Sequence, residues 1–296
     1  MTVATTMSEP CESPTPTPTS ASPCIFDGPD ADIILRAPLH PGSNEFKDFH
    51  VHKLILSIAS AVFRDMFSIP QPPHPASSDA TLDVVQLTEF ANVLESFLKL
   101  IYPVAPPVID NLRLLDDLFQ LADKYVANGV TMKLKQFLVS PSFLKDDPIG
   151  VYAVASRSNL EEEVELAISH TYIINIIPSV SAEHLQTMTT RTYHRLLEEH
   201  ANRRVKILDA FDEALRIPAQ WRLSNSNASC RCAALLRTEI RLQISEKPFL
   251  SMEMLEACNN SANGLNPRPC ADSCCILKPG ASLALMRRAM MKIQGL

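Results

Sequence analysis

Glycine is scarce in this 296-residue chain, and its scarcity excludes several kinds of nucleotide-binding enzyme. The chain has seven glycines, and no two of them lie close together. Loops that cradle phosphate need clustered glycines, because only a backbone without side chains can approach the anion closely. Neither G-x-G-x-x-G nor G-x-x-x-x-G-K-[ST] occurs, so we expect no enzyme of these types.

Long apolar runs and targeting signals are also missing. No run of about 18 apolar residues is present, so we expect no membrane-spanning helix. The first residues, MTVATTMSEPCESP, lack the basic and apolar segments of a secretory signal. We therefore expect an intracellular protein, cytoplasmic or nuclear, without a membrane partner. Its eight cysteines should then be mostly reduced thiols.

Signatures of catalysis are absent as well. The chain has no nucleophile elbow and no H-E-x-x-H, and its densest acids, Glu161–Glu163 and Glu198–Glu199, fall on expected helices as solvated faces. His50 and His52 share one face of an expected strand, but a metal site needs three or four ligands, and the sequence places no third beside them. We expect no enzyme, no catalytic residue, no cofactor and no small-molecule substrate, and we assign no metal site.

Composition and periodicity divide the chain into four parts. Residues 1–24 are rich in Ser, Thr and Pro, which predicts a disordered leader. Residues 28–140 combine strand and helix patterns, and residues 147–217 are almost all helical, with helix starts at Asp147-Pro148 and Ser181. Residues 218–296 form a Cys-containing region that we expect to be partly disordered.

Residues 28–140 contain three expected strands and five expected helices. The strands are ADIILRAP, FKDFHV and TLDVVQL. We expect Ser60 to cap the start of the second helix and Gly129 to cap the end of the fourth. The expected helices cover LILSIA, AVFRDMF, FANVLESFLKLIY, NLRLLDDLFQLADKYVANGV and VTMKLKQFLVS.

This order of elements, together with specific residues, resembles the BTB/POZ domain. That family typically shows a D-[IV]-x-[LIV] strand, an F-x-V-H-K junction, an S-x-[VY]-F-x-x-M-F helix and an A-x-K-Y helix. The composite match is specific because its pieces occur in the right order at the right distances. The matching residues are Asp32–Leu35, Phe49–Lys53, Leu56, Ser60–Phe67, Phe97–Tyr102 and Leu121–Tyr125.

The resemblance implies an α+β fold, a small mixed sheet flanked by helices, followed here by a mostly helical extension that is similar to stand-alone fungal BTB proteins. It implies a non-enzymatic protein–protein interaction module that self-associates as a homodimer or acts as an adaptor or scaffold. The family-motif and possible interface positions are Asp32, His52, Lys53 and Phe63. Apolar area for self-association is expected from Val51, Leu54, Ile55, Ile58, Ala59 and Phe63.

The resemblance also raises a cullin-type ubiquitin ligase scaffold as a partner. Adaptors of this family often carry a φ-x-E motif after the second helix, but the corresponding segment, residues 68–75, has no glutamate. Leu87-Thr88-Glu89 has the right letters at a later place, where we expect Thr88 to cap a helix. The motif therefore does not support this partner.

Charge and cysteine distribution leave one alternative open. Residues 1–220 carry a net charge of −11, which argues against nucleic acid, whereas residues 221–296 carry +5. No histidine follows His200, so a zinc site there would be all-thiolate, and the cysteine spacings do not match the usual C-x₂-C pairs. The alternative is a nuclear regulator whose basic, Cys-rich tail binds zinc or nucleic acid. The candidate zinc ligands are Cys230, Cys232, Cys258, Cys270, Cys274 and Cys275.

Overall fold

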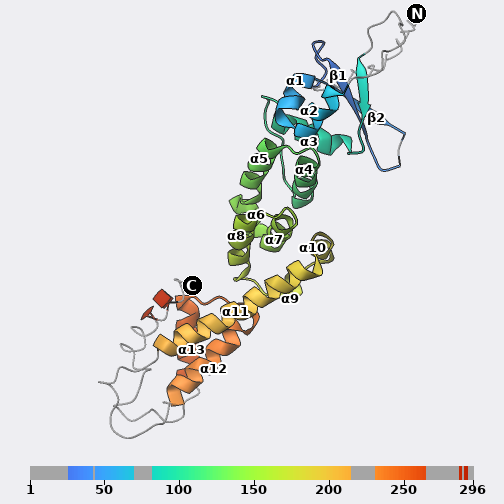
Figure 1. Cartoon of the computed structure of the whole chain (residues 1–296). Coiled ribbons are helices and arrows are strands. Elements are labelled where there is room, and N and C mark those ends of the chain that lie inside the picture. Colours follow the sequence, from blue (N-terminus) through green and yellow to red (C-terminus); the bar gives the residue numbers. More distant parts are fainter. Residues whose placement is uncertain are drawn as a thin grey trace, which may run out of the picture. The chain divides into compact units, whose positions relative to one another are not determined.

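The computed structural model describes residues 26–42, 44–69, 82–214, 231–264, 287–288 and 290–292 (Figure 1). Contacts divide the chain into two compact units, residues 1–95 and residues 96–296, which we describe separately. The expected leader, residues 1–24, lies outside the described residues, as do Cys230, Cys270, Cys274 and Cys275. In the described part of the chain, no helix is long and apolar enough to cross a membrane.

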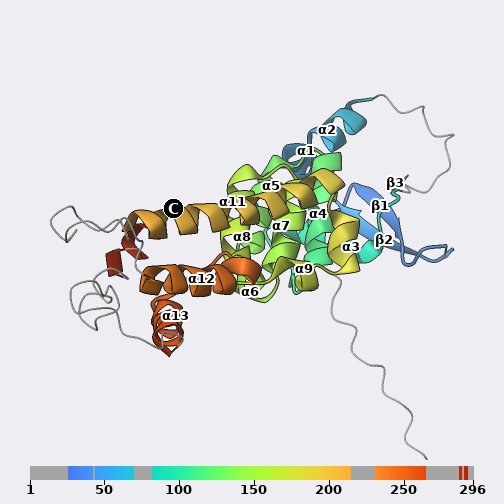
Figure 2. The same cartoon turned by 90° about the horizontal axis from the view of Figure 1, so that it is seen from below.

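The first unit contains a three-stranded mixed sheet in the order β2-β1-β3 (Figure 2). Strand β1 (Ile33–Pro38) pairs antiparallel with β2 (Phe46–Val51) and parallel with β3 (Asp83–Gln86). In β1, Ile33, Leu35 and Ala37 are buried and alternate with half-buried residues, as the period of a strand requires. The expected α+β class with a small mixed sheet is confirmed.

Two short helices follow the β1–β2 pair. Helix α1 (Lys53–Ala59) and helix α2 (Ala61–Ser68) meet at Ser60, whose hydroxyl accepts a hydrogen bond of 3.1 Å from the N–H of Phe63. This bond satisfies one of the free N–H groups at the start of α2, which confirms Ser60 as the cap. Leu56 and Phe63 are fully buried and fix both helices by their apolar side chains.

Helix α3 (Ala91–Ile101) spans the boundary between the units, and α4 (Leu112–Lys124) and α5 (Asn128–Leu138) follow in the second unit. The predicted cap at Gly129 is wrong. Helix α4 already ends at the buried Tyr125, Val126 turns the chain with a φ of +49°, and Gly129 lies inside α5. Burial of the Tyr125 ring therefore sets the end of the helix, even though valine is a costly residue in the left-handed region.

Six helices follow α5, and the last five of them form the described part of the expected helical extension, residues 147–214. Two of these helices start at the predicted caps. The Asp147 carboxylate accepts a hydrogen bond of 2.8 Å from the N–H of Gly150, and the Ser181 hydroxyl accepts one of 3.2 Å from the N–H of His184. The helices are α6 (Pro141–Asp146), α7 (Pro148–Arg157), α8 (Glu161–Thr171), α9 (Ile176–Ser179), α10 (Ala182–Thr187) and α11 (Thr190–Ala214).

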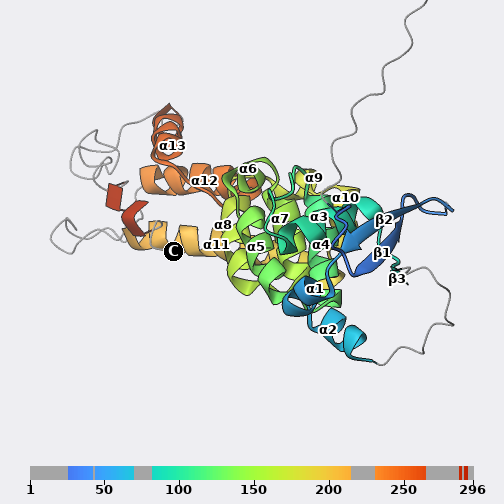
Figure 3. The same cartoon turned by 90° about the horizontal axis from the view of Figure 1, so that it is seen from above.

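The second unit ends in two further helices, α12 (Arg231–Glu246) and α13 (Met252–Gly264). Helix α12 packs against α13 and against α11 (Figure 3). Arg204 on α11 donates a hydrogen bond to the carbonyl of Ser245, near the end of α12. Cys258 on α13 is buried, and this burial raises the pKa of its thiol. The buried residues of these helices include Ile207, Phe211, Leu236, Ile240, Ile244 and Leu255.

Candidate interaction surface

Helix α1 exposes two large apolar side chains on one face. Leu54 is 70% exposed and Ile58 is 78% exposed. Residues four apart lie one above the other on a helix, so these two side chains form a continuous apolar strip. Leu56, between them in sequence, is fully buried and holds the opposite side of the helix in the core. The strip is a candidate surface for contact with another protein.

The strip is narrower than the predicted interface. Val51 and Phe63 are fully buried, and the Phe63 ring stacks on Phe67 with centroids 5.8 Å apart. Phe63 therefore offers its area to the core and not to the surface. Ile55 and Ala59 are half-buried and border the exposed strip.

Asp32 and Lys53, predicted as a pair, meet through the backbone. The Asp32 carboxylate accepts a hydrogen bond of 2.7 Å from the N–H of Lys53, the first residue of α1. A carboxylate at this end of a helix satisfies a free N–H group and faces the positive end of the helix dipole. The Lys53 ammonium instead pairs with Asp83 on β3 at 2.9 Å.

His50 and His52 meet two different carboxylates. His52 Nε2 hydrogen-bonds to Asp30 Oδ2 at 3.1 Å, and this bond lowers the pKa of the Asp30 carboxyl. His50 Nδ1 lies 3.2 Å from Asp27 Oδ1, within ion-pair distance but without a hydrogen bond. Among the described residues, no three His, Cys, Asp or Glu side chains are grouped to hold a metal ion.

Residues 26–30 lie beside the β2–α1 junction, and sequence reasoning gave them no role. Phe26 is buried, its ring packs edge-on against Phe49 with centroids 6.1 Å apart, and its carbonyl accepts a hydrogen bond of 3.0 Å from the N–H of His50. The one available signal was three aspartates, Asp27, Asp30 and Asp32, close before the first strand. Periodicity could not pair them with residues that follow β2.

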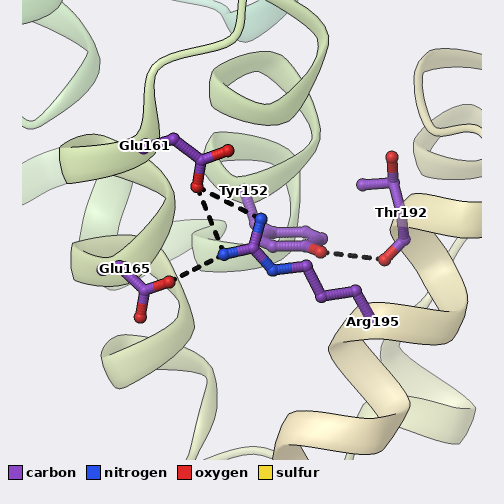
Figure 4. Close-up of polar contacts among 5 residues, drawn as sticks. All are labelled: Tyr152, Glu161, Glu165, Thr192 and Arg195. Atoms are coloured by element: carbon purple, nitrogen blue, oxygen red, sulfur yellow. Dashed lines mark hydrogen bonds and ion pairs between the residues drawn. The ribbon is translucent and has the colours of Figure 1, made fainter.

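The acidic run that opens α8 is not uniformly solvated. Arg195 on α11 pairs with Glu161 at 3.2 Å and with Glu165 at 2.8 Å (Figure 4). Glu163 is buried and pairs with Lys135 at 3.2 Å, so its prediction as part of a solvated face is wrong. These contacts join α8 to α11 and to α5, which is a structural role.

Tyr152 adds a neutral hydrogen bond beside the Arg195 cluster. Its hydroxyl donates to the carbonyl of Thr192 at 2.8 Å, joining the buried helix α7 to the first turn of α11 (Figure 4). Burial raises the pKa of this phenol, so the hydroxyl keeps its proton and remains a donor.

Comparison with known proteins finds one family domain in the N-terminal half of the chain. A family model described as the BTB/POZ domain matches residues 43–142, a range that runs from the turn before β2 into α6. No curated protein matches the chain.

Proposed function

We propose that this chain, which carries a BTB/POZ domain at residues 43–142, self-associates through helix α1 and acts as an adaptor or scaffold for other proteins. BTB/POZ domains are in general protein–protein interaction modules and are typically not enzymes. The observation that carries the proposal is the exposed strip of Leu54 and Ile58 on α1, whose Leu56 is fully buried.

The energetics favour a symmetric contact. In a two-fold dimer the same patch occurs on both partners, so two side chains per chain become four at the interface. Burying a leucine or isoleucine gains roughly 1.5–3 kcal/mol, or about 6–12 kcal/mol for the four. Association costs about 4–15 kcal/mol, so the bordering area of Ile55 and Ala59 must contribute as well.

The adaptor role, including contact with a cullin-type scaffold, rests on the domain alone. The segment where the φ-x-E motif would stand, residues 68–75, has no glutamate, and residues 70–81 lie outside the described part of the chain. The alternative of a zinc-binding or nucleic-acid-binding tail draws no support from Cys258, the one cysteine whose side chain is described, because that thiol is buried in the α13 core.

Sedimentation equilibrium of the full chain tests self-association. We expect the wild type to form dimers at micromolar concentration, and the double variant Leu54→Asp/Ile58→Asp to be monomeric, because four charges would be buried at the contact. Leu242→Asp is the matched control, since Leu242 on α12 is 61% exposed and lies outside α1. A monomeric wild type at 100-fold higher concentration, or a double variant that still dimerises, contradicts the proposal.

A further inference from the structure

We propose that the C-terminal end of helix α11 binds a basic, methionine-containing segment of a partner protein, and that a segment of this chain occupies the site when the partner is absent. We call residues 287–288 and 290–292 the C-terminal segment. The site lies in the second unit, so the inference does not rest on self-association through α1. We call it the α11 site, and it is lined by Lys206, Asp209, Ala210 and Glu213.

The C-terminal segment is attached to α11 by a charged side chain and carries one buried apolar side chain. The Lys292 ammonium forms an ion pair with the Glu213 carboxylate on α11. Met290 is 8% exposed, whereas Met291, the next residue, is 68% exposed. Residues two apart lie within about 7 Å of each other along the chain, so the ion pair places the buried Met290 close to the same end of α11.

The charges of the segment and of the site are complementary. Arg287, Arg288 and Lys292 give the segment three positive charges among its five described residues. The site contains two carboxylates, of Asp209 and Glu213, and a single ammonium group. The C-terminal end of a helix also carries a partial negative charge that attracts cations. A positively charged segment is therefore favoured at this site over a neutral or acidic one.

The C-terminal segment leaves part of the α11 site unfilled. A cavity of about 410 Å³ is lined by Lys292 together with the residues of the site. Asp209 and Glu213 are four residues apart and so lie on one face of α11. An arginine in the place of Lys292 would fill more of this cavity, and its five N–H donors can serve both carboxylates. The segment of this chain is thus not the best ligand that the site can accept.

The C-terminal segment is also held weakly enough to be replaced. The Lys292 and Glu213 side chains are 32% and 59% exposed, and ion pairs of such exposure contribute little to stability. Met290 is the one buried side chain among the described residues of the segment. The segment therefore detaches and docks again at equilibrium, and a partner that binds more tightly displaces it. An adaptor needs a surface for its partner besides any surface for a second copy, and the α11 site is such a surface.

Fluorescence anisotropy of a labelled synthetic peptide that spans residues 283–296 measures access to the site. The full chain with Met290→Asp/Lys292→Glu, which we call the undocked variant, should leave the site free. We expect the peptide to bind this variant at least about ten-fold more tightly than the wild type, because only molecules with a free site can bind it. Met291→Asp is the matched control, because Met291 is exposed, and it should behave like the wild type.

Charge reversal tests whether the peptide binds at the α11 site. In the undocked variant, the further change Glu213→Lys should weaken binding of the peptide about ten-fold, and a peptide with Lys292→Glu should recover most of this loss, because the reversed pair is again attractive. Glu256→Lys is the control, since it reverses an exposed carboxylate on α13 in the same unit and should change nothing.

A third comparison tests whether the site prefers a ligand other than the segment of this chain. A peptide with Lys292→Arg should bind the wild-type chain about three-fold more tightly than the unaltered peptide. Equal binding of the two peptides would show an internal contact only and would overturn the proposal. Peptide binding that is equal in the wild type and the undocked variant, or that Glu213→Lys leaves unchanged, also overturns it. Loss of self-association by the undocked variant in sedimentation equilibrium would show that the segment joins two copies, which contradicts a partner site.

Discussion

His200 on α11 is a residue whose charge is tied to folding. Its side chain is 2% exposed, and Nε2 lies 2.9 Å from the hydroxyl of Thr171 on α8. The Thr171 hydroxyl donates to the carbonyl of Ile168, so it accepts from His200 Nε2–H. Burial, together with the nearby charge of Arg204, lowers the pKa of His200 to about 4. The folded chain therefore keeps this imidazole neutral.

Stability should fall as the medium is acidified through the range between the unfolded and folded pKa of His200. The unfolded chain binds a proton below about pH 6.5 and the folded chain only below about 4, so the neutral form stabilises folding above 6.5 and this contribution is lost by pH 4. The loss amounts to about 3 kcal/mol at most. Urea unfolding at pH 7, 5 and 4 should show the wild type losing this much more than His200→Gln.

The matched control for acid unfolding is His194→Gln, because the His194 side chain is 76% exposed. This variant should follow the wild type at every pH. Equal acid sensitivity of the wild type and His200→Gln would show that the burial of His200 has no energetic consequence.

Among single residues, two helix N-caps were predictable, whereas the C-cap at Gly129 and the exposed surface were not. Ser60 and Asp147 were predicted as helix starts because their side chains can accept from the N–H groups of the first turn, and both do. By contrast, KLILSIA is apolar on nearly every side, so it has no stripe that shows which face is buried. Packing in three dimensions buries Leu56 and leaves Leu54 exposed.

At the scale of elements, two glycines should respond to alanine with opposite signs. A Cβ on Gly150 would lie 2.5 Å from Leu112 Cδ1 and 2.2 Å from Asp147 Oδ2. Asp147 cannot move freely, because it caps α7 and pairs with His184 at 3.0 Å. We expect Gly150→Ala to lower the free energy of unfolding by about 1–3 kcal/mol.

Gly129 is the matched case, because nothing lies within 4 Å of a Cβ added there and the residue is exposed on α5. Gly129→Ala should raise the free energy of unfolding by up to about 1 kcal/mol, since alanine loses less backbone entropy in a helix. Urea denaturation of both variants provides the measurement. A destabilised Gly129→Ala would mean that the position needs glycine after all, as the mistaken cap prediction assumed.

Elements with a clear period were predicted, and elements defined by distant partners were not. The alternation in β1 and the apolar stripe of α4 follow directly from the sequence. Residues 26–32 have no period, and His50 and His52, which contact Asp27 and Asp30, lie more than twenty residues further along the chain. Acidic residues at 27, 30 and 32 can be read as an exposed turn until the fold brings the histidines to them.

At the scale of the whole molecule, the domain could be identified from sequence because several short motifs occur in a fixed order. The C-terminal region could not. Its Asn- and Ser-rich composition suggested loops, yet α13 contains Asn259, Asn260 and Ser261. Burial of Leu255 and Cys258 against neighbouring helices outweighs the weak helix propensity of these residues. Local propensity therefore could not predict α13, because packing against distant residues stabilises this helix.

The parallel pairing of β1 with β3 has a consequence for the order of folding. The antiparallel pair β1–β2 closes a short loop, in which the N–H of Leu39 donates to the carbonyl of Glu45. The parallel pair β1–β3 closes a much longer loop that includes α1 and α2, and there the N–H of Leu87 donates to the carbonyl of Arg36. Closing the longer loop costs more chain entropy, and this cost comes before the contacts between β1 and β3 can stabilise the pair. During refolding, pulse-labelled exchange should protect the Leu39 amide before the Leu87 amide, and simultaneous protection would refute this order. We therefore expect β3 to join the sheet last. Until it does, β1 exposes an open edge to which other chains can bind. Misassembly should be most frequent in the interval before β3 pairs with β1.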